Sequence, residues 1–131
     1  MNLSSVALGI ALSLASAAPA AAQSYFAAHV PATDAQTPVR WGTTPEEAER
    51  SAMEACKRVS KLCASSGAWT DDLNVIFVTM CCKKPRNGCQ TSSGATVFEA
   101  REASLKIFAD AGYSNCTQRS ALSTRDGKPV K

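Results

Sequence analysis

The sequence predicts an α+β fold: a duplicated β-α-β unit whose strands form one largely antiparallel sheet, with two helices on one face and disulfide bonds as staples. Three observations carry this prediction. A T-x-x-E-A motif occurs at Thr44 and again at Thr96, 52 residues later. Short apolar segments typical of strands flank both motifs. All six cysteines follow residue 22, and their number is even.

The N-terminal residues 1–22 have the pattern of a secretory signal peptide. Leu3–Ala15 is an apolar run too short to span a bilayer, and Ala20-Ala21-Ala22 supplies an A-x-A cleavage pattern before Gln23. No later apolar run reaches membrane length, so we expect no transmembrane segment in the mature protein. The prediction is an exported chain, periplasmic or secreted, in which residues 23–131 form a single small domain.

The repeat divides the mature chain into halves at about 25–69 and 75–122. In each motif the threonine is expected to cap a helix, and the glutamate three residues later to return a hydrogen bond to that cap. Both helices then carry one apolar stripe. The stripes comprise Ala48, Ala52, Ala55, Cys56, Val59 and Leu62 in the first helix, and Ala100, Ala103, Ile107, Phe108 and Ala111 in the second.

Strands are expected on both sides of each helix. The offset of 52 aligns residues 25–30 with residues 77–82, and both segments are strand-like. Leu62–Trp69 and Asn115–Leu122 are expected to close the two halves. Residues 123–131 are polar, and we expect this tail to be frayed.

The cysteines are interpreted as a disulfide framework. Three of them, Cys81, Cys82 and Cys89, lie within nine positions around a basic turn, and Cys56, Cys63 and Cys116 complete the set. In an exported chain of this size an even count favours disulfides. Zinc would need four spaced ligands, and the only histidine, His29, is remote in sequence. Thiol redox catalysis lacks a C-x-x-C motif.

Six cysteines allow fifteen complete pairings, and the repeat narrows the choice. Cys56 on the first helix is expected to bond to Cys63 at the start of the next strand, whereas Cys116, which matches Cys63, finds Phe108 in place of a helix cysteine. We therefore predict Cys82 with Cys89 and Cys81 with Cys116. A tight turn at Asn87-Gly88 would oppose Cys89 to Arg86, so this pairing requires a longer loop.

The helix and cysteine pattern resembles a family of bacterial secreted proteins, the domain of unknown function numbered 4189. The similar elements are G-T-T-P-E-E-A, the A-x3-A-x3-C helix with a second cysteine seven residues on, and E-A-R-E-A-S-L-K-I-F-A-D-A-G-Y-S-N-C in the second half. Phe108 departs from the pattern where the first helix has Cys56. The resemblance implies a small exported domain and supplies no catalytic residues.

Few residues could support catalysis or bind a cofactor. His29 is the only imidazole and therefore the only candidate for a histidine-dependent catalytic arrangement, although a structural role at the end of a strand is favoured. Asp71, Asp72 and Asn74 could offer oxygens to a cation, but the loop lacks the spacing of a calcium motif. We expect no catalytic residues, no metal and no cofactor.

The charge distribution offers one candidate contact. The formal net charge is +3, and two cationic clusters contribute to it. Lys57, Arg58 and Lys61 complement the dipole at the end of the first helix, whereas Lys83, Lys84 and Arg86 in the cysteine loop have no such explanation and could contact an acidic envelope protein or an anionic envelope polymer. No aromatic residues are interleaved with these charges, so nucleic acid is not expected.

The sequence thus favours an exported, non-enzymatic binding module of the bacterial cell envelope. An inhibitor or immunity protein against an envelope-acting enzyme, with the Lys83–Gly88 loop as its contact, is the second hypothesis. A small secreted enzyme is the third.

Overall fold

The computed structural model describes residues 25–131, so the expected signal peptide, residues 1–22, lies outside the described residues. Each half of the chain contributes two strands, a helix and a further strand in the same order. These are β1 (Phe26–His29), β2 (Arg40–Gly42), α1 (Pro45–Val59) and β3 (Ala68–Thr70), followed by β4 (Ile76–Lys84), β5 (Gly88–Gly94), α2 (Val97–Asp110) and β6 (Ser114–Ser123). The α+β class and the duplication are confirmed.

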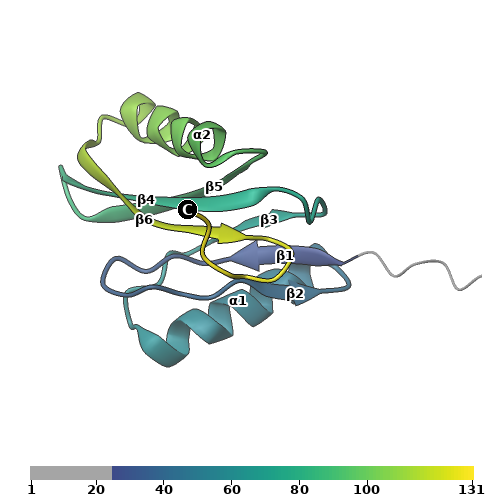
Figure 1. Ribbon diagram of the computed structural model, residues 1–131. Coiled ribbons are helices and arrows are strands. Elements are labelled where there is room, and N and C mark those ends of the chain that lie inside the picture. The colour runs from purple at the N-terminus through teal and green to yellow at the C-terminus, as the bar shows by residue number, and fades with distance from the viewer. Residues whose placement is uncertain (1–24) are drawn as a thin grey trace, which may run out of the picture.

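The strands form two sheets, which corrects the expectation of one sheet with both helices on one face. The sheet orders are β2-β1-β3 and β5-β4-β6, and every pairing is antiparallel. In both sheets the first strand of the half, β1 or β4, lies in the centre, with the second and third strands on either side. Figure 1 shows four layers, with α1 and α2 on the outside and the two sheets stacked between them.

The central strands explain this arrangement because they are buried on both faces. Along β1, Ala28 packs toward α1, whereas its neighbour Ala27 packs against Phe77 of the other sheet. Along β4, Val78 packs toward α2 and Phe77 lies in the layer between the sheets. Successive residues on a strand point to opposite faces, so an apolar run without alternation needs a cover on each side. A single sheet with one wet face would leave half of these side chains in water.

The two helices begin with the same capping hydrogen bonds. The hydroxyl oxygens of Thr44 and Thr96 accept hydrogen bonds from the backbone N–H groups of Glu47 and Glu99, at 3.1 Å in both cases. The glutamate carboxylates reach one residue further back than expected. Each accepts from the N–H of the residue before the cap: Thr43 at 3.3 Å for Glu47 and Ala95 at 3.2 Å for Glu99.

A glycine two residues before each cap lets the helix pack close to its strand. A Cβ atom on Gly42 would lie 2.6 Å from the backbone nitrogen of Ala48, and one on Gly94 would lie 2.6 Å from that of Ala100. Contacts this short with backbone atoms require the helix to move. Both glycines of the sequence repeat therefore serve the same close approach of strand and helix.

The helix stripes are narrower than expected. In α1 the buried residues are Ala48, Ala52, Ala55 and Cys56, whereas Val59, the last residue of the helix, and Leu62, which follows it, are exposed. In α2 the buried residues are Ala100, Ser104 and Phe108, whereas Ile107 is half exposed. Ser104 is tolerated in the core because its hydroxyl donates to the carbonyl of Gln90 at 3.3 Å.

The closing strand expected at Asn115–Leu122 is confirmed as β6, whereas the one expected at Leu62–Trp69 and the expected frayed tail differ from the structure. In the first half, only a bridge between Cys63 and Ala32 precedes the short strand β3. The C-terminal tail is not frayed: Val130 donates its N–H to the carbonyl of Ala121 at 2.9 Å, and Thr124 is fully buried. The tail therefore folds back along β6 and covers part of its edge.

Replacing Thr44 or Thr96 by alanine should lower the free energy of unfolding by about 1 kcal/mol each, because each change removes the acceptor for one helix-terminal N–H. Urea titration followed by circular dichroism measures the loss. Ser65→Ala, at an exposed loop position, is the control and should have no effect. A loss at only one of the two threonines would contradict the equivalence of the two caps.

Candidate interaction site

A hairpin formed by β4 and β5 carries the cysteine loop, and two disulfides tie its base. Cys81 lies directly opposite Cys89 on β5, and Cys82 lies directly opposite Cys116 on β6. Both pairs are bonded, with Cα–Cα distances of 4.1 Å and 3.9 Å. Adjacent cysteines on one strand thus cross-link it to both of its neighbours.

The expected bond between Cys56 and Cys63 is confirmed. The other two expected pairings, Cys82 with Cys89 and Cys81 with Cys116, are wrong. The short hairpin sets the register so that Cys82 faces Gly88 and Cys81 faces Cys89. Since side chains alternate along a strand, Cys82 and Cys89 point to opposite faces of the sheet and cannot meet.

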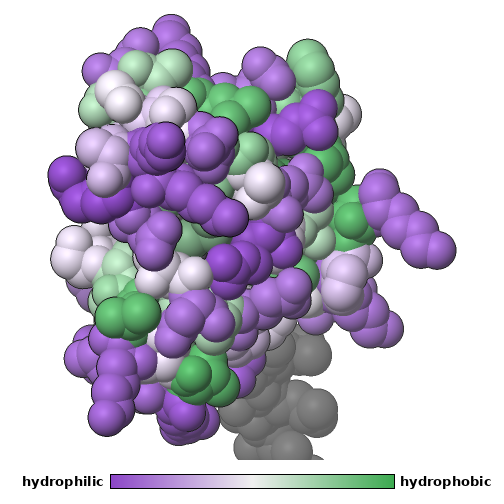
Figure 2. All heavy atoms as spheres, turned by 90° about the vertical axis from the view of Figure 1, so that its left-hand side faces the viewer, coloured by the Kyte–Doolittle hydropathy of each residue, from purple (hydrophilic) through white to green (hydrophobic). Residues whose placement is uncertain are grey.

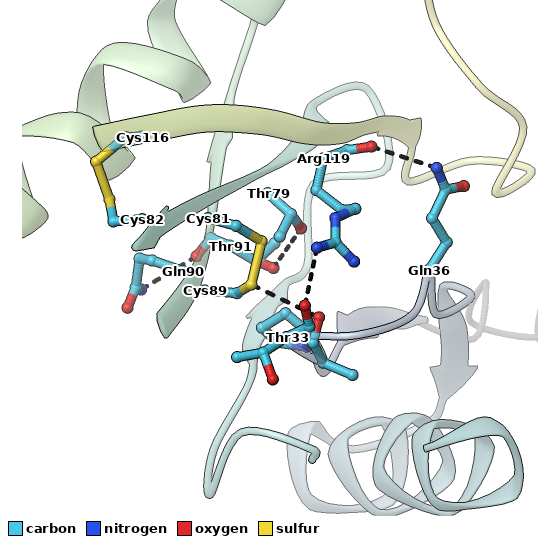
Figure 3. Close-up of a disulfide and its surroundings, with 12 residues drawn as sticks. Thr33, Gln36, Thr79, Cys81, Cys82, Cys89, Gln90, Thr91, Cys116 and Arg119 are labelled. Atoms are coloured by element: carbon cyan, nitrogen blue, oxygen red, sulfur yellow. Dashed lines mark hydrogen bonds between the residues drawn. A yellow bond between two sulfur atoms is a disulfide. The ribbon is translucent and has the colours of Figure 1, made fainter. Parts of the chain in front are cut away.

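The two hairpin disulfides lie in different layers. Cys82 is buried with Phe108 beneath α2. The Cys81–Cys89 disulfide lies on the opposite face, toward the first half of the chain, and the Cys89 sulfur is 3.6 Å from the carbonyl oxygen of Ala32 (Figure 3). One disulfide at the base of the loop therefore packs beneath α2, and the other packs against the β1–β2 connection.

The three cations of the loop are all exposed, but they do not form one patch. Lys83 follows the alternation of Cys81 and lines a cavity on the inner side of the sheet. Lys84 follows the alternation of Cys82 and points to the other face. Arg86 lies over the ring of Tyr113, with its guanidinium carbon 5.5 Å from the ring centroid.

The second cationic cluster lies at the same end of the molecule. The C-terminal end of α1 carries Lys57, Arg58 and then Lys61, and in Figure 1 it lies on the same side as the β4–β5 turn. Figure 2 views this end and shows hydrophilic residues across most of its middle, with apolar residues in separate groups. Asp34, which accepts a hydrogen bond from Ser60, adds a carboxylate beside the α1 cluster.

Two residues that the sequence did not single out also belong to this end of the molecule. Arg119 of β6 extends across to the β1–β2 connection, where it donates from Nη2 to the carbonyl of Thr33 at 2.9 Å (Figure 3). Both residues line the same cavity as Lys83. Nothing in the local sequence marks them, because strand register alone brings them together.

His29 lies between the two sheets and is only 1% exposed. Its Nδ1 is 2.8 Å from the hydroxyl of Thr91, and its Nε2 is 2.9 Å from the carbonyl of Thr37, which fixes Nε2 as a donor. Burial lowers the pKa of His29, and the hydrogen bond to Thr37 opposes this only in part. The imidazole is therefore a neutral core group with both nitrogens engaged.

The acidic loop between the halves, residues 71–74, is a turn closed by its own side-chain hydrogen bonds. Asp72 accepts the backbone N–H of Asn74 at 2.9 Å, and the Asn74 side chain accepts from Arg125. Within residues 25–131, no three His, Cys, Asp or Glu side chains gather in a way that could hold a metal ion.

No family model, curated protein or solved structure matches this chain. The resemblance to the secreted domain family 4189 therefore stays a prediction. Among the described residues, no helix is long and apolar enough to cross a membrane. Three disulfides engage all six cysteines, which indicates an oxidising compartment outside the cytoplasm.

The disulfide register predicts the behaviour of three double variants. Cys81→Ala/Cys89→Ala and Cys82→Ala/Cys116→Ala should each leave no free thiol, whereas Cys82→Ala/Cys89→Ala should leave two, as measured by thiol titration in denaturant. Loss of the Cys82–Cys116 bond, with a sequence separation of 34, should cost about 4 kcal/mol in the chain-entropy model, against about 2.5 kcal/mol for the Cys81–Cys89 bond. Thiol counts in the reverse order would restore the original pairing.

Stability should fall in mild acid because His29 is buried in its neutral form. The unfolded chain has the ordinary pKa of about 6.5, and the folded pKa is lower, so the unfolded state takes up the proton first. The contribution is fully present above pH 6.5 and is lost progressively as the pH falls toward the folded pKa. Urea midpoints at pH 7.5 and 5.5 should differ less in His29→Gln than in the wild type. Equal differences would assign the acid sensitivity to other groups.

Proposed function

We propose that this protein is an exported, non-enzymatic binding module of the bacterial cell envelope, periplasmic or secreted, and that the Lys83–Gly88 hairpin contacts an acidic partner. The observation that carries the proposal is the attachment of this hairpin. Two disulfides hold the base of a short loop that presents three exposed cations at one end of the molecule.

The rigidity of the hairpin supports a role in binding. A loop that is already ordered loses little conformational entropy when a partner docks, so more of the contact energy appears as affinity. Its charges favour a partner of opposite sign and also raise the rate of encounter. An acidic envelope protein and an anionic envelope polymer both meet this requirement.

The position of His29 supports the non-enzymatic part of the proposal. The only imidazole of the chain lies in the core, and the gap that borders it has no room for a water molecule, with a volume of about 0 Å³. A substrate would need access to this group before it could serve as a general base.

An inhibitor or immunity protein against an envelope-acting enzyme is the second candidate. The same observation favours it, because a stapled loop that keeps its shape is suited to blocking a site. The two candidates differ in the partner that they predict: an enzyme whose activity falls on binding, or an envelope component without one.

Affinity capture from a bacterial envelope extract tests the proposal with two matched variants. Lys83→Ala/Lys84→Ala/Arg86→Ala removes three charges from the hairpin, and Lys57→Ala/Arg58→Ala/Lys61→Ala removes three from the end of α1. The hairpin variant should bind about tenfold more weakly than wild type, and salt should weaken wild-type binding. The α1 variant should retain its partner. Equal capture by all three proteins would refute the hairpin as the contact.

A further inference from the structure

The second sheet extends past the first and leaves part of its inner face uncovered. Strands β4 and β6 have 9 and 10 residues, whereas β1 and β3 have 4 and 3. The pairings with Gly42 and Gly94 make Phe26 of β1 equivalent to Ile76 of β4, so His29, the last residue of β1, corresponds to Thr79. Strand β4 continues beyond Thr79 to Lys84. No residue of β1, β2 or β3 lines the cavity at Lys83, so the strands of the first half do not cover the inner face there.

A β-bulge adds a charged side chain to the uncovered region. Thr79 pairs with Ser120 and Met80 pairs with Gln118, so Arg119 is the extra residue of β6. A bulge lets consecutive residues project on the same side of a sheet and re-aims side chains. In Figure 3 the Arg119 side chain points away from β6 toward Thr33, to which it donates a hydrogen bond of 2.9 Å.

Arg119 and Lys83 line one cavity of about 200 Å³, with the Cys81–Cys89 disulfide and Asn87 among its other walls. No aspartate or glutamate lines it. The guanidinium has five N–H donors, and the structure commits one of them to Thr33. Among the described residues, the Lys83 side chain has no hydrogen-bond or ion-pair partner, and it is exposed. The cavity thus holds two cationic groups without a counter-charge.

We infer that this cavity, at the base of the hairpin, binds a single carboxylate side chain from an acidic segment of a protein partner. This inference deepens the proposed binding function and rests on it. The volume is below the roughly 300 Å³ at which small-molecule pockets begin, which suits one side-chain group. The planar fork of Arg119 matches the two oxygens of a carboxylate.

The directions of the neighbouring cations favour a protein over a membrane surface. Lys83 lies on the inner face of the sheet, Lys84 on the opposite face, and Arg86 over Tyr113. A flat lipid surface can approach only one of these directions at a time. An acidic segment that enters the cavity with one side chain can place its other carboxylates along the hairpin, near Lys84 or Arg86.

Adjacent lysines provide a matched test. The probe is a fluorescent hexaglutamate peptide, and anisotropy at low salt gives its Kd for the exported protein, Lys83→Ala and Lys84→Ala. Both variants lose one charge from one exposed strand end, but only Lys83 lines the cavity. We expect Lys83→Ala to bind about tenfold more weakly and Lys84→Ala less than about twofold more weakly, because only the first loses a direct charged hydrogen bond.

Arg119→Gln is the second variant and should also weaken the peptide about tenfold, provided that its thermal melting curve is unchanged. An equal loss of hexaglutamate affinity in Lys83→Ala and Lys84→Ala would show that the cavity is not the carboxylate site. The capture experiment tests binding by the hairpin separately, so this result would leave the proposed function standing. Failure of the wild type to bind hexaglutamate would also overturn the inference. Binding to phosphatidylglycerol vesicles that depends on Lys83 but not Lys84 would reassign the cavity to phosphate and overturn the carboxylate.

Discussion

The packing of the two sheets against each other is the constraint on which the rest of the structure depends. It buries the inner faces of β1 and β4, where Ala27 and Phe77 form part of a common apolar layer. Each half alone would be a small three-stranded sheet with a helix on one side and an apolar face exposed on the other. The halves therefore stabilise each other, and a duplicated unit becomes one fold.

The inner layer also holds the polar and covalent cross-links that distinguish the two halves. In sequence, His29 and Thr37 lie 52 residues before Cys81 and Cys89, although the strand pairing makes His29 the structural equivalent of Thr79. In the first half the imidazole Nε2 lies 3.0 Å from the Thr37 hydroxyl, and in the second half a disulfide joins Cys81 to Cys89. The buried hydrogen bond and the disulfide thus each join residues with a sequence separation of 8. The imidazole is buried by the facing sheet, whereas the disulfide is partly exposed where β4 and β5 extend beyond that sheet.

The same constraint creates the candidate site. Because the strands of the second half are longer, the inner face that is apolar at Phe77 becomes polar and cationic at Lys83 and Arg119, where the first sheet no longer covers it. The two hairpin disulfides, one on each face of the sheet, then join β4 to β5 and β4 to β6 at the base of the loop. The cationic side chains and the two disulfides thus lie together at one end of the molecule, which supports a binding role.

The sequence by itself determined the local features of this protein. The capping motifs at Thr44 and Thr96, the glycines before them, and the Cys56–Cys63 bond depend on residues within a few positions of each other, where backbone geometry leaves few choices. The cationic loop was likewise visible as a cluster in sequence. The unbroken apolar runs of β1 and β4 already contained the signal for two covered faces, although it was interpreted as part of a single sheet.

Only the tertiary structure decided the split into two sheets, the hairpin pairings and the place of Arg119. A shift of one residue in strand register moves every side chain to the other face, so Cys81 and Cys82 could exchange partners without any change in composition. The bulge that turns Arg119 toward Thr33 arises from the pairing of β4 with β6, strands separated by a helix and a third strand. Such long-range register depends on how the whole chain packs, and no short segment of the sequence encodes it.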